Sequence, residues 1–338
     1  MFRILHVGLG PLGKLIVSDL AKRGIGTVVA AVDVNPGIAG RSLDAVVPGC
    51  GFSARVAGTI GEAAAGQSFD VAVLTTSSDL SKCMGSLREL AALGLPIVST
   101  CEELLYPWLR HPVLAEELDA LCKRHGARML GTGVNPGFLM DTLPVALTAV
   151  CRNVRGVRIT RVQDATTRRI PFQQKIGAGL DDAAFAAKVK DGSLRHVGLG
   201  ESLHFVSHYL GLNVETWEET IEPVKADRDL SCGLGPIPRG RAAGVRQVAK
   251  GWARGQSKSD QPVIQMEFQA AIAQTDPRDE IVLDAEPPIR MVIPGAVHGD
   301  VATSAITLNA IPATIAAAPG LHTMATVPLV HYVPGRTA

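Results

Sequence analysis

The stretch VGLGPLG, residues 7–13, decides the fold of this chain. It follows the apolar run Phe2–Val7 and opens a segment of helical periodicity, Leu12–Arg23, so its glycines stand in a turn between a strand and a helix. In a GxGxxG spacing, the first glycine permits a tight turn, the second lets a pyrophosphate approach the backbone, and the third lets helix and strand pack closely. A glycine-rich turn without a ligand is the alternative, but the strand–turn–helix context favours a dinucleotide site.

This turn supplies the first cofactor-binding candidates. A helix that begins directly after it presents unpaired N–H groups and the positive end of its dipole to phosphates. We therefore expect a dinucleotide to lie against Gly8, Gly10, Pro11, Leu12 and Gly13.

An acid at the end of the second apolar run completes the pattern. Asp33 closes the run Val28–Val34, where a carboxylate accepts hydrogen bonds from the adenine ribose hydroxyls. Its charge would repel a 2′-phosphate and so favours NAD. Arg41 becomes a partner for a 2′-phosphate if the loop Asn35–Gly40 folds back, and is otherwise a solvated loop charge. Both NAD and NADP therefore stay open as cofactors.

Outward from the turn, short apolar runs alternate with helical segments as far as residue 141. Near-continuously apolar strands separated by helices indicate a parallel sheet covered on both faces, a doubly wound α/β Rossmann domain. The helical segments stop at Gly24, Gly94 and Gly126, where a left-handed C-terminal cap is expected. The further strands are predicted at Val71–Thr75, Ile97–Thr100 and Arg128–Gly131, and the further helices at Leu80–Leu93 and Val113–His125.

The pattern changes after Asp141. Val157–Gln163 and Val263–Phe268 alternate apolar with polar residues, and Ile289–Ile293 is a further strand candidate, which indicates a mostly open sheet with one solvated or cavity-facing side. Helices are expected around 182–189 and 203–210. We predict a substrate and dimerisation domain of α+β type over 142–297. A long small-residue helix from His298 is expected to return to the first domain, which then comprises 1–141 and 298–338.

Composition narrows the function classes. The chain has 338 residues, 46% of them hydrophobic, and a formal net charge of +1, so electrostatics give no case for nucleic acid or a membrane surface as partner. No apolar run reaches the roughly 20 residues that cross a bilayer, and the N-terminus reads as a strand and not as a signal peptide. The six cysteines are scattered, which fits free thiols in a reducing cytoplasm. No pair of histidines or acids has ligand spacing, so no metal is expected.

The stretch IVSTCEELLYPW, residues 97–108, places two carboxylates after the fifth strand, on the side of the sheet where cofactor and substrate bind. If Thr100 is the N-cap of a helix beginning at Cys101, Glu103 completes a capping box and Glu102 is free to project toward the cleft. If Ser99 is the N-cap, the two roles are exchanged. Both acids are otherwise ordinary first-turn acids. We favour Glu102 as the acid/base group, with Glu103 as the alternative.

Further polar and aromatic residues follow the strands. Thr75, Thr76 and Ser77 are expected to line the cofactor groove, or to cap the next helix. Asn135, in an Asn-Pro-Gly turn, is a candidate for the nicotinamide carboxamide or the substrate, or a turn-forming residue. Tyr106 and Trp108 are candidates for an apolar or cation–π wall near the substrate, or are plain core aromatics, and Phe138 is a further candidate for substrate contact.

Several stretches together resemble one family. They are the GxGxxG turn with Asp33, STCEELLYPW, GTGVNPGFLMD, RRIPFQQKIGAG and the terminal HGDVATSAITLNAIPATI with PGLHTM. The chain resembles the 2,4-diaminopentanoate dehydrogenases and the related native amine dehydrogenases, which share a dihydrodipicolinate-reductase type of N-terminal domain. The resemblance implies reversible NAD(P)-linked oxidative deamination of a primary amine to a ketone or aldehyde plus ammonia, without a metal, in a homodimer. It also implies that the acid after the fifth strand is catalytic.

Two other functions are weighed against this one. The chain lacks the His-His stretch and the Lys-x-Asp-Ala-Pro-Ser-Gly-Thr run of true dihydrodipicolinate reductases, so that particular reaction is less favoured. An NAD(P)-dependent reductase of another C=N or C–OH bond in amino-acid metabolism is the first alternative. A non-catalytic dinucleotide-binding regulator is the second, because fold alone does not fix function.

Overall fold

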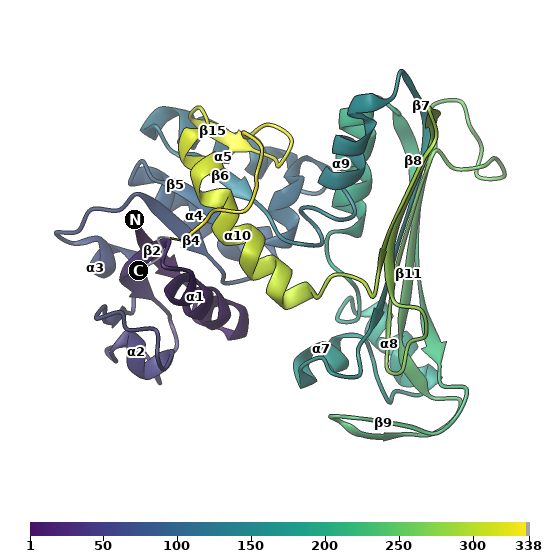
Figure 1. Cartoon of the computed structure of the whole chain (residues 1–338), viewed down its shortest axis with the longest axis horizontal. Helices are drawn as coiled ribbons and strands as arrows, with labels where there is room; N and C mark the ends of the chain where they lie inside the picture. Colours follow the sequence, from purple (N-terminus) through teal and green to yellow (C-terminus); the bar gives the residue numbers. More distant parts are fainter. Residues whose placement is uncertain (336–338) are drawn as a thin grey trace. The chain divides into compact units, whose positions relative to one another are not determined.

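The computed structural model describes residues 1–335, which form two compact units (Figure 1). The first unit combines Met1–Phe138 with the segment from His298 onward, and the second is Leu139–Val297. The chain therefore leaves the first unit once and returns to it through its C-terminal segment.

A seven-stranded sheet forms the centre of the first unit, in the order β15-β6-β5-β4-β1-β2-β3. Every pairing in it is parallel. Strand order reverses between β1 and β4, and ligands of such sheets bind at this switch point, outside the carboxyl ends of the strands. The strands are β1 Phe2–Val7, β2 Gly26–Val32, β3 Val56–Ala57, β4 Val71–Leu74, β5 Pro96–Ser99, β6 Arg128–Gly131 and β15 Gly320–His322.

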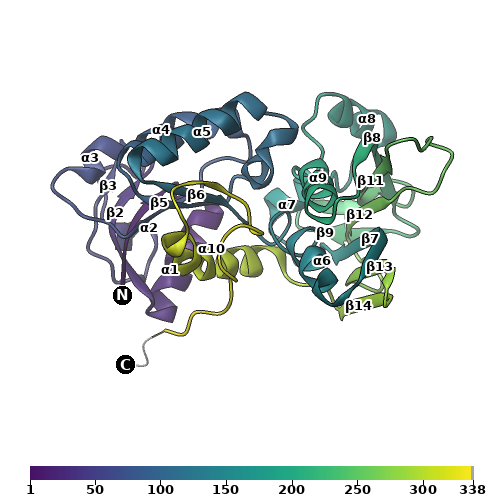
Figure 2. The ribbon, with the colours of Figure 1, turned by 90° about the horizontal axis from the view of Figure 1, so that it is seen from above.

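Helices cover both faces of this sheet (Figure 2). α1 (Pro11–Arg23) and α10 (Gly299–Ala316) pack against each other and share one apolar core with the strands. α4 (Leu80–Ala92) and α5 (Pro112–His125) bury their apolar faces in a second core on the other side. The remaining short helices of this unit are α2 Leu43–Val46 and α3 Ile60–Ala64, and the 3₁₀ turns are η1 Glu102–Leu105 and η2 Pro107–Leu109.

A six-stranded mixed sheet forms the second unit, in the order β14-β13-β7-β12-β11-β8. Only β12 and β7 pair in parallel. Helices α8 and α9 pack on this sheet, and one apolar core includes Phe185 of α8 together with Val245 and Phe268 of the sheet. The strands are β7 Asn153–Asp164, β8 Val214–Lys225, β11 Ala242–Ala253, β12 Ile264–Ala271, β13 Arg278–Glu286 and β14 Ile289–Pro294, and β9 Leu230–Cys232 pairs with β10 Gly235–Ile237. The helices are α6 Thr142–Leu147, α7 Ile170–Lys175, α8 Asp182–Lys190 and α9 Leu199–Leu210, with the 3₁₀ turn η3 Thr148–Val150.

The predicted class, a doubly wound parallel sheet followed by an α+β part, is confirmed. Three helices of the first unit end next to a glycine in the left-handed conformation. These glycines are Gly24, Gly94 and Gly126, with φ angles of 61°, 70° and 70°. The helix expected to start at Cys101 is wrong: the structure has the two 3₁₀ turns η1 and η2 there, and Pro107 stands where an α-helix would need a donor. Within residues 1–335, no helix is long and apolar enough to cross a membrane.

Candidate active site

The glycine turn adopts a geometry that tolerates only glycine at two of its three positions. Gly8 has a φ of 98°, and a Cβ there would lie 2.8 Å from the carbonyl oxygen of Thr75. A Cβ on Gly13 would lie 2.1 Å from the Gly8 carbonyl oxygen. The turn and the start of α1 are therefore packed against β1 and β4 without room for a side chain.

Gly10 is different, because a Cβ built on it meets nothing within 4 Å. It is the N-cap of α1, and no side-chain hydrogen bond caps the start of this helix. A cavity of about 410 Å³ opens at this point, lined by residues of the glycine turn, β2, α3, the end of β4 and α4. Backbone donors at a helix start beside such a cavity fit the pyrophosphate of a dinucleotide.

Asp33 lines the cavity and also holds the turn in place. Its Oδ2 accepts a hydrogen bond of 2.6 Å from the Leu9 amide, and its Oδ1 accepts one of 2.8 Å from the Asn35 amide. Arg41, in contrast, donates to the Ala45 carbonyl oxygen at 3.2 Å and is not among the cavity-lining residues. The structure thus brings Asp33 to the site but leaves Arg41 in its own loop.

The end of β4 is tied to the glycine turn by Thr75. Its Oγ1 donates to the Gly8 carbonyl oxygen at 2.7 Å, and Nε2 of the buried His6 approaches the same oxygen at 3.0 Å. Because a carbonyl oxygen only accepts, His6 carries its proton on Nε2. Burial lowers the pKa of His6 from 6.5 to about 4, so the ring is neutral near pH 7.

The three residues at the end of β4 divide between the two roles expected for them. Thr75 and Thr76 line the cavity, whereas Ser77 does not, and its Oγ accepts a hydrogen bond of 3.2 Å from the Asp79 amide. Asp79 in turn caps α4 at the Lys82 amide. Pro11, Leu12 and Gly13 lie behind the cavity wall, where they begin the helix.

Glu103 has a structural role that sequence spacing did not predict. Its Oε2 accepts 2.9 Å from the Leu80 amide at the start of α4 and lies 3.1 Å from His111 Nε2, and the residue is 7% exposed. Thr100 is not its capping partner, because η1 begins after Cys101 and has no side-chain cap. The expected capping box is therefore wrong, and Glu103 instead caps a helix far from it in sequence.

Glu102 occupies the first position of η1, directly after β5. It is half-buried, whereas Glu103 is buried. The backbone before it is fixed, because the Thr100 amide donates to the Leu74 carbonyl oxygen at 3.0 Å and Ser99 Oγ accepts from the Cys101 amide at 3.1 Å. Glu102 therefore stands at the carboxyl edge of the parallel sheet, next to the end of β4.

The remaining candidates lie after β5 and β6. The rings of Tyr106 and Trp108 contact each other with centroids 5.4 Å apart, and Trp108 is 37% exposed. Asn135 and Phe138 are half-buried on the turn that follows β6, which includes the close-packed Gly137. None of these four lines the dinucleotide cavity, so their roles stay predictions.

Two residues of the site gave no signal in the sequence. His6 looks like one residue of an apolar strand, and His111 stands in a loop before α5. Both became visible only through their contacts with the Gly8 carbonyl oxygen and the Glu103 carboxylate.

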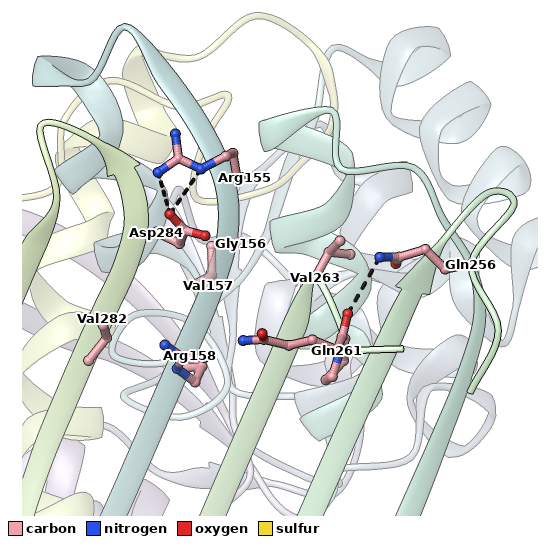
Figure 3. A pocket seen from close by; sticks show the side chains of 10 residues that line it. Arg155, Gly156, Val157, Arg158, Gln256, Gln261, Val263, Val282 and Asp284 are labelled. Atoms are coloured by element: carbon pink, nitrogen blue, oxygen red, sulfur yellow. Dashed lines mark hydrogen bonds and ion pairs between the residues drawn. The ribbon is translucent and has the colours of Figure 1, made fainter. Parts of the chain in front are cut away.

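A hollow of about 170 Å³ on the second unit is lined by the exposed Arg155–Asp284 pair, by neighbouring residues of β7 and β13, and by Gln256 and residues 261–263 before β12 (Figure 3). No group of three His, Cys, Asp or Glu residues within 1–335 is arranged to hold a metal ion.

Parallel strand order, the glycine turn, the uncapped helix start and the acid after β2 define a dinucleotide-binding domain of the Rossmann type. A family model of the 2,4-diaminopentanoate dehydrogenase C-terminal domain matches residues 138–337. The chain belongs to this dehydrogenase family. Membership confirms the resemblance and the predicted class, an NAD(P)-dependent dehydrogenase of the amine-dehydrogenase type.

Individual relatives are similar to this chain over nearly its full length. The 2,4-diaminopentanoate dehydrogenase of Acetoanaerobium sticklandii is 28% identical over 98% of this chain and 95% of its own. An amine dehydrogenase from Mycobacterium smegmatis matches in structure with a TM-score of 0.84 at 24% identity, covering 99% of this chain and 98% of that one. The WlbA dehydrogenase from Bordetella pertussis, solved with NADH and UDP-GlcNAcA, matches with a TM-score of 0.53 at 15% identity, covering 92% of this chain and 87% of that one.

Proposed function

We propose that this chain oxidises a primary amine to a ketone or aldehyde plus ammonia, reversibly, with Glu102 as its acid/base group. The observation that carries the proposal is that the two glutamates after β5 have different positions and contacts. Glu103 is held by the Leu80 amide and His111, whereas Glu102 begins the turn beside the strand ends that we propose to bind the dinucleotide. Family membership supplies the reaction class.

One carboxylate can serve each proton transfer of this reaction. Glu102 would hold the substrate ammonium, accept its proton, and later orient and deprotonate the water that attacks the iminium carbon. Its negative charge also stabilises the cationic iminium. The nicotinamide, when bound, supplies the acceptor for the hydride. In the reverse direction Glu102 holds ammonia and assists the loss of water from the carbinolamine.

For the cofactor we propose a preference for NAD over NADP. Gly8, Gly10, Asp33, Thr75 and Thr76 would hold the dinucleotide. The described cavity-lining residues include the acids Asp33 and Glu89 and no lysine or arginine. A 2′-phosphate would therefore meet negative charge without a compensating cation, so we expect tighter binding of NADH than of NADPH in a fluorescence titration.

The activity is tested by NADH oxidation with a panel of ketones and aldehydes in concentrated ammonium, on wild type, Glu102→Gln and Glu103→Gln. We expect ammonium-dependent turnover by the wild type and its loss in Glu102→Gln, with NADH binding retained. Turnover that ignores ammonium would instead indicate reduction of a C=N or C–OH bond. NADH binding with no turnover of any carbonyl compound would indicate a regulator.

We further propose that the protein acts as a cytoplasmic homodimer on small molecules, without nucleic acid or membrane partners. All six cysteines are free thiols, which fits a reducing compartment. The net charge of +1 gives no attraction for a polyanion. Light scattering after size exclusion tests the dimer, and a monomer mass at micromolar concentration would contradict it.

A further inference from the structure

The dinucleotide cavity continues beyond the part that fits the phosphates. The glycine turn and the end of β4 line one part of it, and Asp33 follows at the end of β2. The other lining residues come from three segments, namely the residue after Asp33, the start of α3 and one face of α4. They are Val34, Gly58, Thr59, Ile60, Ser86 and Glu89. This second part of the cavity is available to the base that a dinucleotide carries next to its ribose.

Two apolar side chains in this part suit a flat purine ring. Val34 is 88% exposed although it is apolar, whereas Ile60 is 6% exposed, and both line the cavity. Contact between an aromatic ring and such side chains is favourable, because it removes apolar surface from water. Apolar contact holds different purines equally well, so these two residues cannot select one base.

Ser86 and Glu89 add polar groups to the same part of the cavity. They are three residues apart in α4 and are therefore neighbours on one face of the helix. Arg88 is turned toward α5 instead, since its guanidinium donates to the Glu117 carboxylate at 2.6 and 3.0 Å. Figure 2 shows α4 between α3 and α5. Within residues 1–335, neither the Ser86 hydroxyl nor the Glu89 carboxylate forms a hydrogen bond or ion pair.

The other polar side chains in this region already hold the backbone. Both carboxylate oxygens of Asp33 accept hydrogen bonds from backbone amides. Thr59 Oγ1 accepts from the Glu62 amide at 3.2 Å and so caps α3. Ser86 and Glu89 are therefore the lining residues whose side chains can give all of their hydrogen-bonding capacity to a ligand.

The chemistry of this pair distinguishes between purines. A carboxylate only accepts hydrogen bonds, whereas a hydroxyl donates or accepts. Adenine has an amino group at C6, which donates, next to the ring nitrogen N1, which accepts. In a 6-oxo purine a carbonyl oxygen replaces the amino group and N1 carries a proton. The oxygen of a 6-oxo purine would then face the Glu89 carboxylate, and two acceptors repel each other.

We propose that Glu89 is a specificity-determining residue that selects adenine as the base of the dinucleotide. Its carboxylate accepts a hydrogen bond from the adenine amino group, and the Ser86 hydroxyl donates to N1. The inference rests on the dinucleotide binding proposed above, and it is independent of which amine is oxidised.

The experiment titrates the full-length protein with NADH and with reduced nicotinamide hypoxanthine dinucleotide, which carries the 6-oxo purine. Nicotinamide fluorescence gives both Kd values without any amine substrate. For the wild type we expect NADH to bind about tenfold more tightly, the effect of one hydrogen bond to a charged acceptor. Equal Kd values for the two dinucleotides would overturn the proposal.

Variants assign the preference to Glu89. In Glu89→Gln the amide can donate as well as accept, so the ratio of the two Kd values should fall to about one. Glu89→Ala should give the same ratio by weakening NADH binding. Glu116→Gln is the matched control, because it removes the same charge from an exposed residue of α5 that does not line the cavity, and it should keep the wild-type ratio. A wild-type ratio in both Glu89 variants, or its loss in Glu116→Gln, would contradict the role of Glu89.

Failure of the proposed activity gives a different result. If the protein oxidises no amine but shows the expected Kd ratios, the selection of adenine by Glu89 is supported and the amine dehydrogenase activity is not. If neither dinucleotide binds, the assignment of the cavity to a dinucleotide fails, and the role of Glu89 fails with it.

Discussion

At the scale of single residues, the contrast between Glu102 and Glu103 gives the first prediction. Glu102→Gln keeps the size and a hydrogen-bonding end but cannot accept the substrate proton, so we expect kcat to fall about 10²–10⁴-fold with the NADH Kd unchanged. Glu103→Gln is the matched control. It should instead lower the unfolding midpoint, because the Leu80 amide and His111 lose a charged acceptor.

Steady-state kinetics and thermal unfolding on the same two variants separate these roles. The assignment of Glu102 fails if Glu103→Gln loses the larger share of kcat while its unfolding midpoint stays at the wild-type value. It also fails if Glu102→Gln retains full turnover.

His6 gives a prediction about pH. Unfolded, it takes up a proton near pH 6.5, but the folded protein resists protonation until about pH 4. Between these values the unfolded state binds more protons, so the free energy of unfolding falls as the pH falls. Full loss amounts to about 3 kcal/mol, since one pKa unit corresponds to about 1.4 kcal/mol.

Urea unfolding between pH 7 and pH 4 checks this. His6→Gln, whose amide can still donate to the Gly8 carbonyl oxygen, should show a flatter pH dependence than the wild type. His125→Gln, which changes an exposed histidine, should follow the wild-type curve. Parallel curves for wild type and His6→Gln would show that His6 does not contribute.

At the scale of elements, the glycine turn allows a paired test. Gly13→Ala places a Cβ 2.1 Å from the Gly8 carbonyl oxygen, so it should cost about 1–3 kcal/mol of stability as well as cofactor binding. Gly10→Ala meets nothing within 4 Å and has a φ of −65°, so its unfolding midpoint should stay near that of wild type. Its methyl group should nevertheless weaken NADH binding by about tenfold or more, or about 1.4 kcal/mol. Thermal unfolding and NADH titration of both variants provide the comparison.

These elements also show what sequence could predict. The glycine turn, Asp33 and the helix-ending glycines depend on neighbours in the chain, so local pattern was sufficient for them. The role of Glu103 depends on Leu80, which lies close only because β4 and β5 pair. No spacing rule within residues 97–108 contains that information.

Strands β11 and β8 were not predicted from the sequence, because their residue patterns differ from those of a typical strand. In β11 the half-exposed Arg246 and Lys250 are four residues apart among buried neighbours, a spacing that imitates one face of a helix. β8 is an edge strand rich in charged residues, so it lacks the apolar run of a central strand. β13 was not predicted either, although it pairs with both β7 and β14.

At the scale of the whole molecule, each unit has its own core and its own buried polar contacts. In the second unit, Arg161 Nη1 contacts Asp279 Oδ1 at 2.6 Å, with 2% and 7% of the side chains exposed. Asp279 Oδ2 accepts from the Val297 amide at 2.8 Å, and Arg161 donates to the Val297 carbonyl oxygen at 2.7 Å. This pair therefore fixes the last residue of the unit before the chain continues to α10.

Removing one member of the pair gives the last prediction. Asp279→Ala leaves the Arg161 charge buried without its acid and frees the Val297 amide, so it should destabilise the protein by about 3–5 kcal/mol. The control is Asp284→Ala, which breaks the exposed pair with Arg155 and should cost less than about 1 kcal/mol (Figure 3). Because the dinucleotide cavity is lined only by residues of the first unit, NADH Kd should stay at the wild-type value in both variants under native conditions. Denaturant unfolding and NADH titration measure the two quantities, and a tenfold weaker Kd in folded Asp279→Ala would contradict the separation of stability from cofactor binding.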